Sequence, residues 1–199
     1  MTFTGNRQHK FLLGVDEAGR GPLAGPVAVG VVAVPMNFII TREFPGLVDS
    51  KQMSPLAREK MFRLLRMRMR EGDIQFCVRC TSAKRIDEWG LTRAVARATA
   101  RGVRYLTPEP EGVSIYLDGL LKAPREYDQQ TIIGGDEAVP IIALASIAAK
   151  VVRDRFMTRL AKQFPEYGFE KHKGYGTEEH YKALKKHGLC DIHRRSFLH

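Results

Sequence analysis

The feature that most constrains this chain is a pair of adjacent carboxylates, Asp16 and Glu17, between an apolar run and a glycine-rich turn. Acidic side chains are rarely buried unless they are paired or bound to a metal. Glycines, as in the Gly-Arg-Gly sequence at residues 19–21, let backbone amides approach a ligand closely. The segment therefore favours a site for a divalent metal and a phosphate. A strand-ending turn with solvated acids is the alternative, and this segment alone does not decide between them.

Length and charge narrow the class of protein. The 199 residues suit one domain, which can bury a core without disulfides or a structural metal. The net charge of +10 favours a polyanionic partner such as nucleic acid, because clustered Lys and Arg release counterions from phosphates. A basic but inert surface is the alternative.

Cysteines and apolar runs bear on location. Three cysteines in a chain of this size favour a reducing compartment, and an odd offset within a strand sends Cys77 and Cys80 to opposite faces. We therefore expect no zinc or redox pair there. The N-terminus lacks the apolar core of a signal peptide, and the apolar runs at residues 27–34 and 139–149 are shorter than the about 20 residues that cross a bilayer. We expect a cytoplasmic protein with no membrane partner.

Strand signals come before most helix signals along the chain. The expected strands cover residues 11–15, 27–34, 74–80, 113–117 and 131–133. The expected helices cover residues 56–70, 82–98 with an interruption near Trp89-Gly90, 140–163, and a last helix from residue 178 to Gly188. Ser54, Ser82 and Thr177 are expected N-caps. The order indicates an α/β fold, a mixed sheet flanked by helices, with a helical C-terminal portion.

Acids stand at three of the expected strand ends. Asp16 and Glu17 follow the first strand, Asp118 follows the fourth, and Asp136 follows the last. Because ligands gather beyond the carboxyl ends of strands in open α/β sheets, these acids could converge. Converging carboxylates repel one another, and two magnesium or manganese ions would cancel that charge and activate water for phosphodiester hydrolysis. Asp118 as a turn residue and Asp136 as a helix N-cap are the alternatives.

At this point the chain resembles the type 2 ribonucleases H, specifically the bacterial ribonuclease HII family. The motifs keep their order and spacing over nearly the whole chain, and DEAGRG followed by DSK and KGYGT is highly specific. The matching segments are DEAGRGPLAGPV at residues 16–27, DSKQMS at 49–54, YLDG at 116–119, GGD at 134–136, ASIAAKVVRD at 145–154, KGYGT at 173–177 and HRRSF at 193–197.

The resemblance implies a ribonuclease H-like fold, an activity and a set of site residues. The implied catalytic and metal-binding residues are Asp16, Glu17, Asp118 and Asp136, with two manganese or magnesium ions during catalysis. The implied substrate-binding residues are Gly19, Arg20 and Gly21 at the 2'-hydroxyl, Tyr175 stacked on a sugar at the RNA–DNA junction, and Lys51, Ser146, Lys150 and Arg153. Residues 1–160 would form the catalytic domain, and residues 161–199 a helical substrate-binding segment packed on it.

The implied substrates are RNA/DNA hybrids and single ribonucleotides embedded in duplex DNA. The enzyme would be a monomer that cuts on the 5' side of the ribonucleotide and leaves 3'-hydroxyl and 5'-phosphate ends. One departure from the family pattern is Gly134, where lysine is commoner. The positive charge that is missing here would contact a phosphate or tune Asp136. The four histidines His172, His180, His187 and His193 have no convincing zinc spacing, and we expect surface or structural roles for them.

Two other functions stay open at this point. A noncatalytic nucleic-acid-binding module would use the basic helices and Tyr175, but would give no reason for four acids. A nuclease of related fold, such as a junction resolvase, would not need a group that senses ribose. The type 3 relatives usually carry an extra N-terminal domain, and only about ten residues precede the first expected strand here, which disfavours that subtype.

Overall fold

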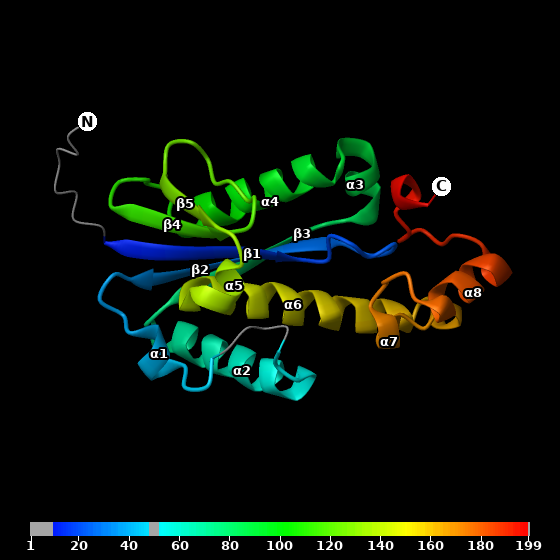
Figure 1. The fold of residues 1–199 in the computed structure, drawn as a ribbon, viewed down its shortest axis with the longest axis horizontal. Coiled ribbons are helices and arrows are strands. Elements are labelled where there is room, and N and C mark those ends of the chain that lie inside the picture. Colours follow the sequence, from blue (N-terminus) through cyan, green and yellow to red (C-terminus); the bar gives the residue numbers. More distant parts are fainter. Residues whose placement is uncertain (1–9, 48–51, 199) are drawn as a thin grey trace.

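The computed structural model describes residues 10–47 and 52–198, which form a five-stranded sheet with helices on both faces (Figure 1). The strand order is β3-β2-β1-β4-β5. β1 pairs antiparallel with β2 and parallel with β4, so the sheet is mixed, as predicted. The strands are β1 (Phe11–Ala18), β2 (Val27–Pro35), β3 (Gln75–Thr81), β4 (Val113–Asp118) and β5 (Asp128–Ile132).

The helices cover both faces of the sheet and continue beyond it at the C-terminal end. The two long helices of the first half are α2 (Pro55–Glu71) and α4 (Leu91–Leu106), and the longest helix is α6 (Pro140–Ala161). The shorter ones are α1 (Ile40–Glu43), α3 (Ala83–Trp89), α5 (Gly135–Ala138), α7 (Phe169–His172), α8 (Glu178–His187) and the 3-10 helices η1 (Pro165–Tyr167) and η2 (Arg195–Phe197).

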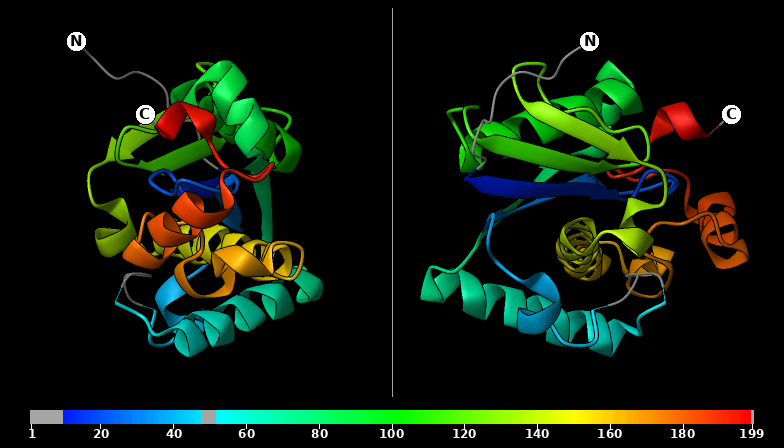
Figure 2. Two further views of the ribbon diagram at one scale, coloured as in Figure 1. Left: turned by 90° about the vertical axis from the view of Figure 1, so that its right-hand side faces the viewer. Right: turned by 60° about the vertical axis from the view of Figure 1, so that its left-hand side comes forward.

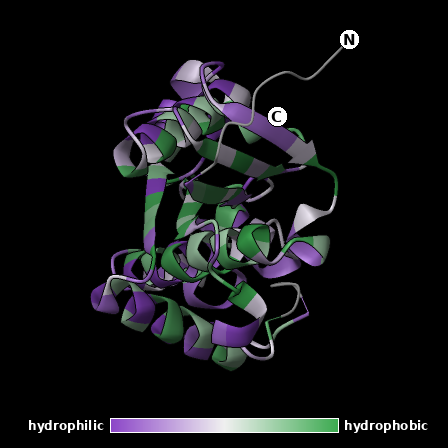
Figure 3. Cartoon of the chain, turned by 90° about the vertical axis from the view of Figure 1, so that its left-hand side faces the viewer, coloured by the Kyte–Doolittle hydropathy of each residue, from purple (hydrophilic) through white to green (hydrophobic). Residues whose placement is uncertain are grey.

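Helix α6 lies between the sheet and α2, while α4 covers the opposite face (Figure 2). Period-two alternation divides the strand side chains between two cores: Leu13 and Val15 pack on the α4 side, and Val32 and Val34 pack on the α6 side. Figure 3 shows α6 as largely hydrophobic, as expected for a helix covered on two sides.

Two glycines bring α6 close to the sheet. A Cβ atom on Gly14 would lie 2.2 Å from the carbonyl oxygen of Ile141, and a Cβ on Gly30 would lie 2.2 Å from that of Ala145. No larger residue fits at either position without moving α6. This close packing places the next turns of α6 beside the end of β1, where Asp16 lies.

The predicted helix boundaries are confirmed at their caps. Ser54, Ser82 and Thr177 each accept a hydrogen bond from the amide three residues later, and Pro55 is the first residue of α2. Gly90 separates α3 from α4 with φ +78°, so the expected interruption is real, and α8 ends at Gly188. Cys77 is buried and Cys80 exposed, as the strand alternation predicted.

Two strand predictions were wrong in their bounds. β1 continues through Asp16 and Glu17 to Ala18, since these residues pair with β2 opposite Gly30 and Val29. β5 covers Asp128–Ile132, three residues earlier than the predicted start, and Ile133 lies outside it and is 88% exposed. This edge strand is polar, so it lacks the apolar alternation that identifies a half-buried strand.

The C-terminal segment follows α6 and packs on its end. Tyr167 and Phe169 share a small core with Met157 and Ala161 of α6 and with Ala24 of the β1–β2 connection. Ala24 and His193 also form an isolated antiparallel bridge. The segment is therefore tied to the connection that follows Asp16 and Glu17.

Candidate active site

One pocket of about 500 Å³ gathers most of the residues that the sequence singled out. All four acids line it, from the ends of β1 and β4 and from α5. They are joined by the Gly-Arg-Gly segment and by side chains of α6 and the α7–α8 connection. The predicted residues that line the pocket are Asp16, Glu17, Asp118, Asp136, Gly19, Arg20, Gly21, Ser146, Lys150 and Tyr175.

The acids converge because β1 and β4 are adjacent parallel strands. Asp16 lies near the end of one and Asp118 ends the other, and both carboxyl ends lie at the same edge of the sheet. Asp118 Oδ1 accepts a hydrogen bond of 2.7 Å from the amide of Gly135, which fixes the start of α5. Asp136, the next residue, is thereby held at the same edge and is only 2% exposed.

Burial makes the acids costly to ionise. Asp16 is 4% exposed, and its pKa is raised to about 8. Burial is the largest cause; a hydrogen bond from Ser146 opposes it, and the charges of Glu17 and Asp118 add to it. Burial also raises the pKa of Glu17, against the attraction of Arg20. A cation in the pocket would offset both effects.

The donor set fits a hard divalent cation. All four acids offer oxygen, which magnesium and manganese prefer, and Glu17 Oε2 is buried without a hydrogen-bond partner among the described residues. Protein donors occupy other oxygens: Arg20 Nη1 lies 3.3 Å from Glu17 Oε1, and the Glu17 amide donates to Asp16 Oδ1. As they stand, no three His, Cys, Asp or Glu side chains in the described ranges are grouped to hold an ion. Binding would therefore require small rotations of these side chains.

The backbone that follows the acids is held from beneath by two buried arginines. Arg194 donates to the carbonyl oxygens of Gly19 (2.6 Å), Arg20 (2.8 Å) and Gly25 (3.0 Å). Its guanidinium has no exposed surface. Burial, followed by repulsion from Arg153, lowers the pKa of Arg194 to about 9.

Tyr175 also lines the pocket. It lies between two glycines, is 42% exposed, and has Lys150 Nζ 5.7 Å from its ring centroid. A chain of hydrogen bonds ends on its backbone: the amide of Cys190 donates to His193 Nδ1, His193 Nε2 lies 2.9 Å from His180 Nε2, and His180 Nδ1 lies 2.9 Å from the Tyr175 carbonyl oxygen. The chain closes only if both imidazoles are neutral.

Comparison with known proteins decides the family. A family model described as Ribonuclease HII matches residues 13–199. A ribonuclease HII from Endomicrobium trichonymphae is 46% identical over 186 residues, which cover 92% of this chain and 83% of the relative.

The chain belongs to the ribonuclease HII family.

Solved structures agree with this assignment. The ribonuclease H2 of Pyrococcus horikoshii OT3 superposes with a TM-score of 0.76 at 28% identity, over 94% of both chains. Bst-RNase HIII in complex with Mn²⁺ shares the fold, with a TM-score of 0.70 at 20% identity over 97% of this chain and 68% of the other. Membership of the ribonuclease HII family makes the protein a ribonuclease H endonuclease, which acts on RNA/DNA hybrids. It disfavours the noncatalytic module and the junction resolvase.

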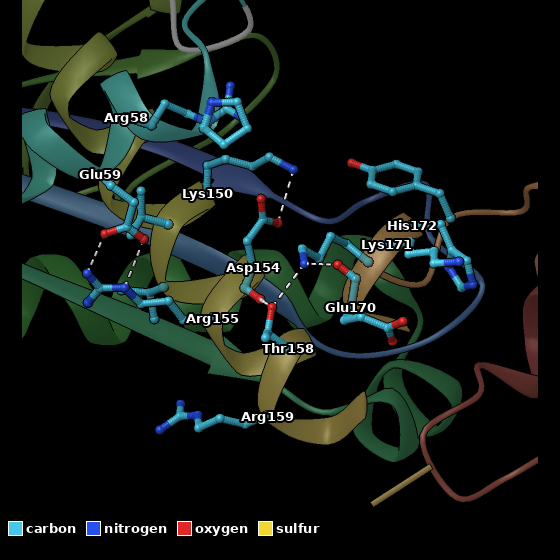
Figure 4. A pocket seen from close by; sticks show the side chains of 15 residues that line it. Arg58, Glu59, Lys150, Asp154, Arg155, Thr158, Arg159, Glu170, Lys171 and His172 are labelled. Atoms are coloured by element: carbon cyan, nitrogen blue, oxygen red, sulfur yellow. Dashed lines mark hydrogen bonds and ion pairs between the residues drawn. The ribbon is translucent and has the colours of Figure 1, made fainter. Parts of the chain in front are cut away.

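A second hollow, of about 1010 Å³, adjoins the pocket that the four acids line (Figure 4). The two share Arg58, Lys150 and Tyr175. Lys150 Nζ lies 3.0 Å from Asp154 Oδ1, and Arg155 Nε donates to Glu59 at 3.0 Å, which joins α6 to α2. The structure thus pairs Arg155 with a carboxylate of α2.

One predicted substrate-binding residue, Arg153, does not line the pocket. Arg153 was expected to meet phosphate, but its side chain is fully buried and donates to the carbonyl oxygens of Pro26, Ala24 and Lys173. The expectation treated this arginine as a surface residue of α6, whereas the β1–β2 connection and Lys173 cover it. Lys51 lies outside the described residues.

Sequence reasoning missed two residues. Arg58 lines the pocket from the first turn of α2, where its signal was only one arginine among many on a basic helix. Arg194 lies in the HRRSF motif, one of the segments on which the resemblance rests, but the resemblance assigned no role to this residue. Among the described helices, none is both long and apolar enough to cross a membrane.

Proposed function

We propose that this ribonuclease H endonuclease is metal-dependent and cuts on the 5' side of single ribonucleotides in duplex DNA, as well as in RNA/DNA hybrids. One observation carries the proposal: four acids from β1, β4 and α5 line the same pocket as the Gly19-Arg20-Gly21 backbone. Carboxylates supply the metal chemistry, and amides beside glycines can reach the 2'-hydroxyl, the group that distinguishes RNA from DNA.

In this proposal Asp16, Glu17, Asp118 and Asp136 hold two magnesium or manganese ions. When bound, such ions supply an activated water and stabilise the leaving oxygen, so the products carry 3'-hydroxyl and 5'-phosphate ends. The Ser146 hydroxyl orients the carboxylate of Asp16, to which it is hydrogen-bonded. The ammonium of Lys150 would meet a phosphate of the bound strand, which its position at the border of the pocket and the adjoining hollow supports.

Tyr175 would stack on a sugar at the junction between ribonucleotide and DNA, and the segment from residue 161 onwards would help to bind the duplex. Lys51 stays a proposed phosphate contact. Arg153 is not proposed as a phosphate contact, because its guanidinium is buried beneath the connection between β1 and β2. We further propose that the protein acts as a monomer in the cytoplasm, in the removal of ribonucleotides during DNA replication and repair.

A duplex with one embedded ribonucleotide tests the proposal. With magnesium or manganese, wild type should make one nick, 5' to the ribonucleotide, and should leave the matched all-DNA duplex intact. A chelator should abolish the nick, and Asp16→Asn should reduce its rate about 100-fold or more, since several kcal/mol of charge stabilisation are lost. An intact ribonucleotide duplex, or undiminished cleavage by Asp16→Asn, would refute the assignment.

A further inference from the structure

Most of the carbonyl oxygens of the connection between β1 and β2, residues 19–26, accept hydrogen bonds from two arginines. The Arg194 guanidinium donates hydrogen bonds to the carbonyl oxygens of Gly19, Arg20 and Gly25. Its backbone amide donates to the carbonyl oxygen of Leu23. The Arg153 guanidinium donates hydrogen bonds to the carbonyl oxygens of Ala24 and Pro26. Six of the eight carbonyl oxygens therefore accept from these two arginines.

The amides of the same connection divide into two groups. Those of Leu23, Ala24 and Gly25 donate to Gly174 and Ile192, and so tie the connection to the C-terminal segment. Those of Gly19, Arg20 and Gly21 donate to no other residue in the ranges that the structure describes, and these three residues line the pocket. The amides of residues 19–21 are therefore available as hydrogen-bond donors in the pocket, while the arginines bind the carbonyl oxygens of the same connection.

Peptide geometry links the two groups. A trans peptide unit is planar, so its N–H points away from its C=O; none of the described peptide bonds is cis. The peptide between Gly19 and Arg20 has its oxygen 2.6 Å from Arg194 Nη2, and the next peptide has its oxygen 2.8 Å from Nη1. One guanidinium therefore sets the direction of two consecutive N–H groups, those of Arg20 and Gly21.

We infer that Arg194 is a positioning residue for ribose recognition, whose guanidinium aims the Arg20 and Gly21 amides at the oxygen of the substrate's 2'-hydroxyl. This inference rests on the proposed function of the pocket. An arginine suits the task because its rigid fork can hold two neighbouring carbonyls at once, whereas a lysine is a point donor. Burying this guanidinium is costly even with its carbonyl hydrogen bonds and the attraction of Asp87, which indicates a role beyond stability.

Arg153 supports the same arrangement. Its side chain runs directly under Gly19, where an added Cβ would lie 2.0 Å from Arg153 Nε, and Gly19 has φ +91°. Arg153 Nη2 also donates to the carbonyl oxygen of Lys173, two residues before Tyr175. The two arginines thus place the ribose-facing amides and the Tyr175 turn relative to each other.

Binding discrimination tests the inference. Affinities are measured in chelator, so that nothing is cut, for a duplex with one ribonucleotide and for the same duplex in DNA. Wild type should prefer the ribonucleotide duplex. Arg194→Lys should reduce that preference about tenfold, the effect of two misdirected hydrogen bonds, while its affinity for the DNA duplex and the salt dependence stay unchanged. Arg104→Lys is the matched control, because Arg104 makes a two-pronged contact with Glu126 away from the pocket.

The outcomes separate this inference from the proposed function. If wild type shows no preference, ribose sensing by the pocket fails, and this inference fails with it. If wild type shows the preference and a folded Arg194→Lys keeps it, only the role of Arg194 is overturned, even where the melting temperature has dropped.

A second measurement uses the wild-type protein, so it can be made even if Arg194→Lys does not fold. The amide NMR signals of Arg20 and Gly21 should shift with the ribonucleotide duplex and stay near their free positions with the DNA duplex. Equal shifts with both duplexes would overturn the inference.

Discussion

Asp118 Oδ1 accepts a 2.7 Å hydrogen bond from the backbone amide of Gly135. This contact joins the end of β4 to the first residue of α5, so one carboxylate of the pocket fixes the position of the next, Asp136. Asp118 thus has two tasks, one in the fold and one in the proposed metal site, and substitutions can separate them.

Asp118→Asn should keep the fold and lose activity. The amide oxygen of asparagine can still accept from Gly135, so the melting temperature should stay within about 3 °C of wild type, while cleavage falls about 100-fold or more. Asp118→Ala removes the acceptor as well and should lose about 1–3 kcal/mol of unfolding free energy. Thermal unfolding and single-turnover cleavage measure the two effects; equal stability of the two variants would contradict the positioning task.

Gly134 offers a test of the family departure. It has φ +66°, and a Cβ atom added there would meet no other atom within 4 Å, so both Gly134→Ala and Gly134→Lys should cost about 1 kcal/mol of stability from backbone strain alone. Lysine additionally brings a positive charge next to Asp136 and should lower KM relative to alanine at low salt, with the difference fading at high salt. Identical KM values for the two variants would show that the missing charge is unimportant.

Tyr175 should act through its ring. Tyr175→Phe keeps an aromatic surface between the two glycines, so its KM should stay within about twofold of wild type. Tyr175→Ala should raise KM about tenfold or more, since stacking on an aromatic side chain contributes about 1–3 kcal/mol per base. Steady-state kinetics on the ribonucleotide duplex distinguish the two. Wild-type kinetics for Tyr175→Ala would rule out a stacking role.

The buried histidine pair should contribute a loss of stability in acid. Burial, with repulsion from His180, lowers the pKa of His193 from 6.5 to about 4. Between these values the unfolded chain binds a proton at His193 that the folded state does not bind, so the contribution of His193 to stability falls as pH drops from 6.5 and levels off below about 4. The loss should be about 3 kcal/mol.

Denaturant unfolding at a series of pH values measures this slope. His187→Asn is the control, because His187 is exposed and its replacement should leave the slope intact. Replacing His193 with asparagine should flatten the slope. Because the raised pKa of Asp16 acts in the opposite direction over this range, the deciding quantity is the difference in stability between wild type and His193→Asn. A difference that does not change between pH 6.5 and 4 would contradict the neutral histidine chain.

The sequence predicted those parts of the fold and the pocket that follow from local patterns. The caps at Ser54 and Thr177 follow from side-chain chemistry next to periodic helices. The meeting of Asp16 and Asp118 follows from a general rule about strand ends in such sheets. The bounds of strand β5 were predicted wrongly because an edge strand needs no apolar face.

The arginines could not be predicted in the same way. Arg153 and Arg194 are charged residues on segments that read as basic surface, and sequence patterns place such side chains in water. Their burial depends on a connection more than 120 residues away in the chain, whose glycine-rich backbone offers carbonyls close together. Only the three-dimensional arrangement shows that these two charges support the pocket from within.

The most direct test of the account is the position of manganese in a crystal of the wild-type protein soaked with Mn²⁺. Anomalous scattering locates the ion without reference to activity. The account predicts manganese in the pocket, with oxygens of Asp16, Glu17, Asp118 and Asp136 around it after small side-chain rotations and with Arg20 displaced from Glu17. A pocket without manganese at saturating concentration, or manganese bound elsewhere on the protein alone, would contradict it.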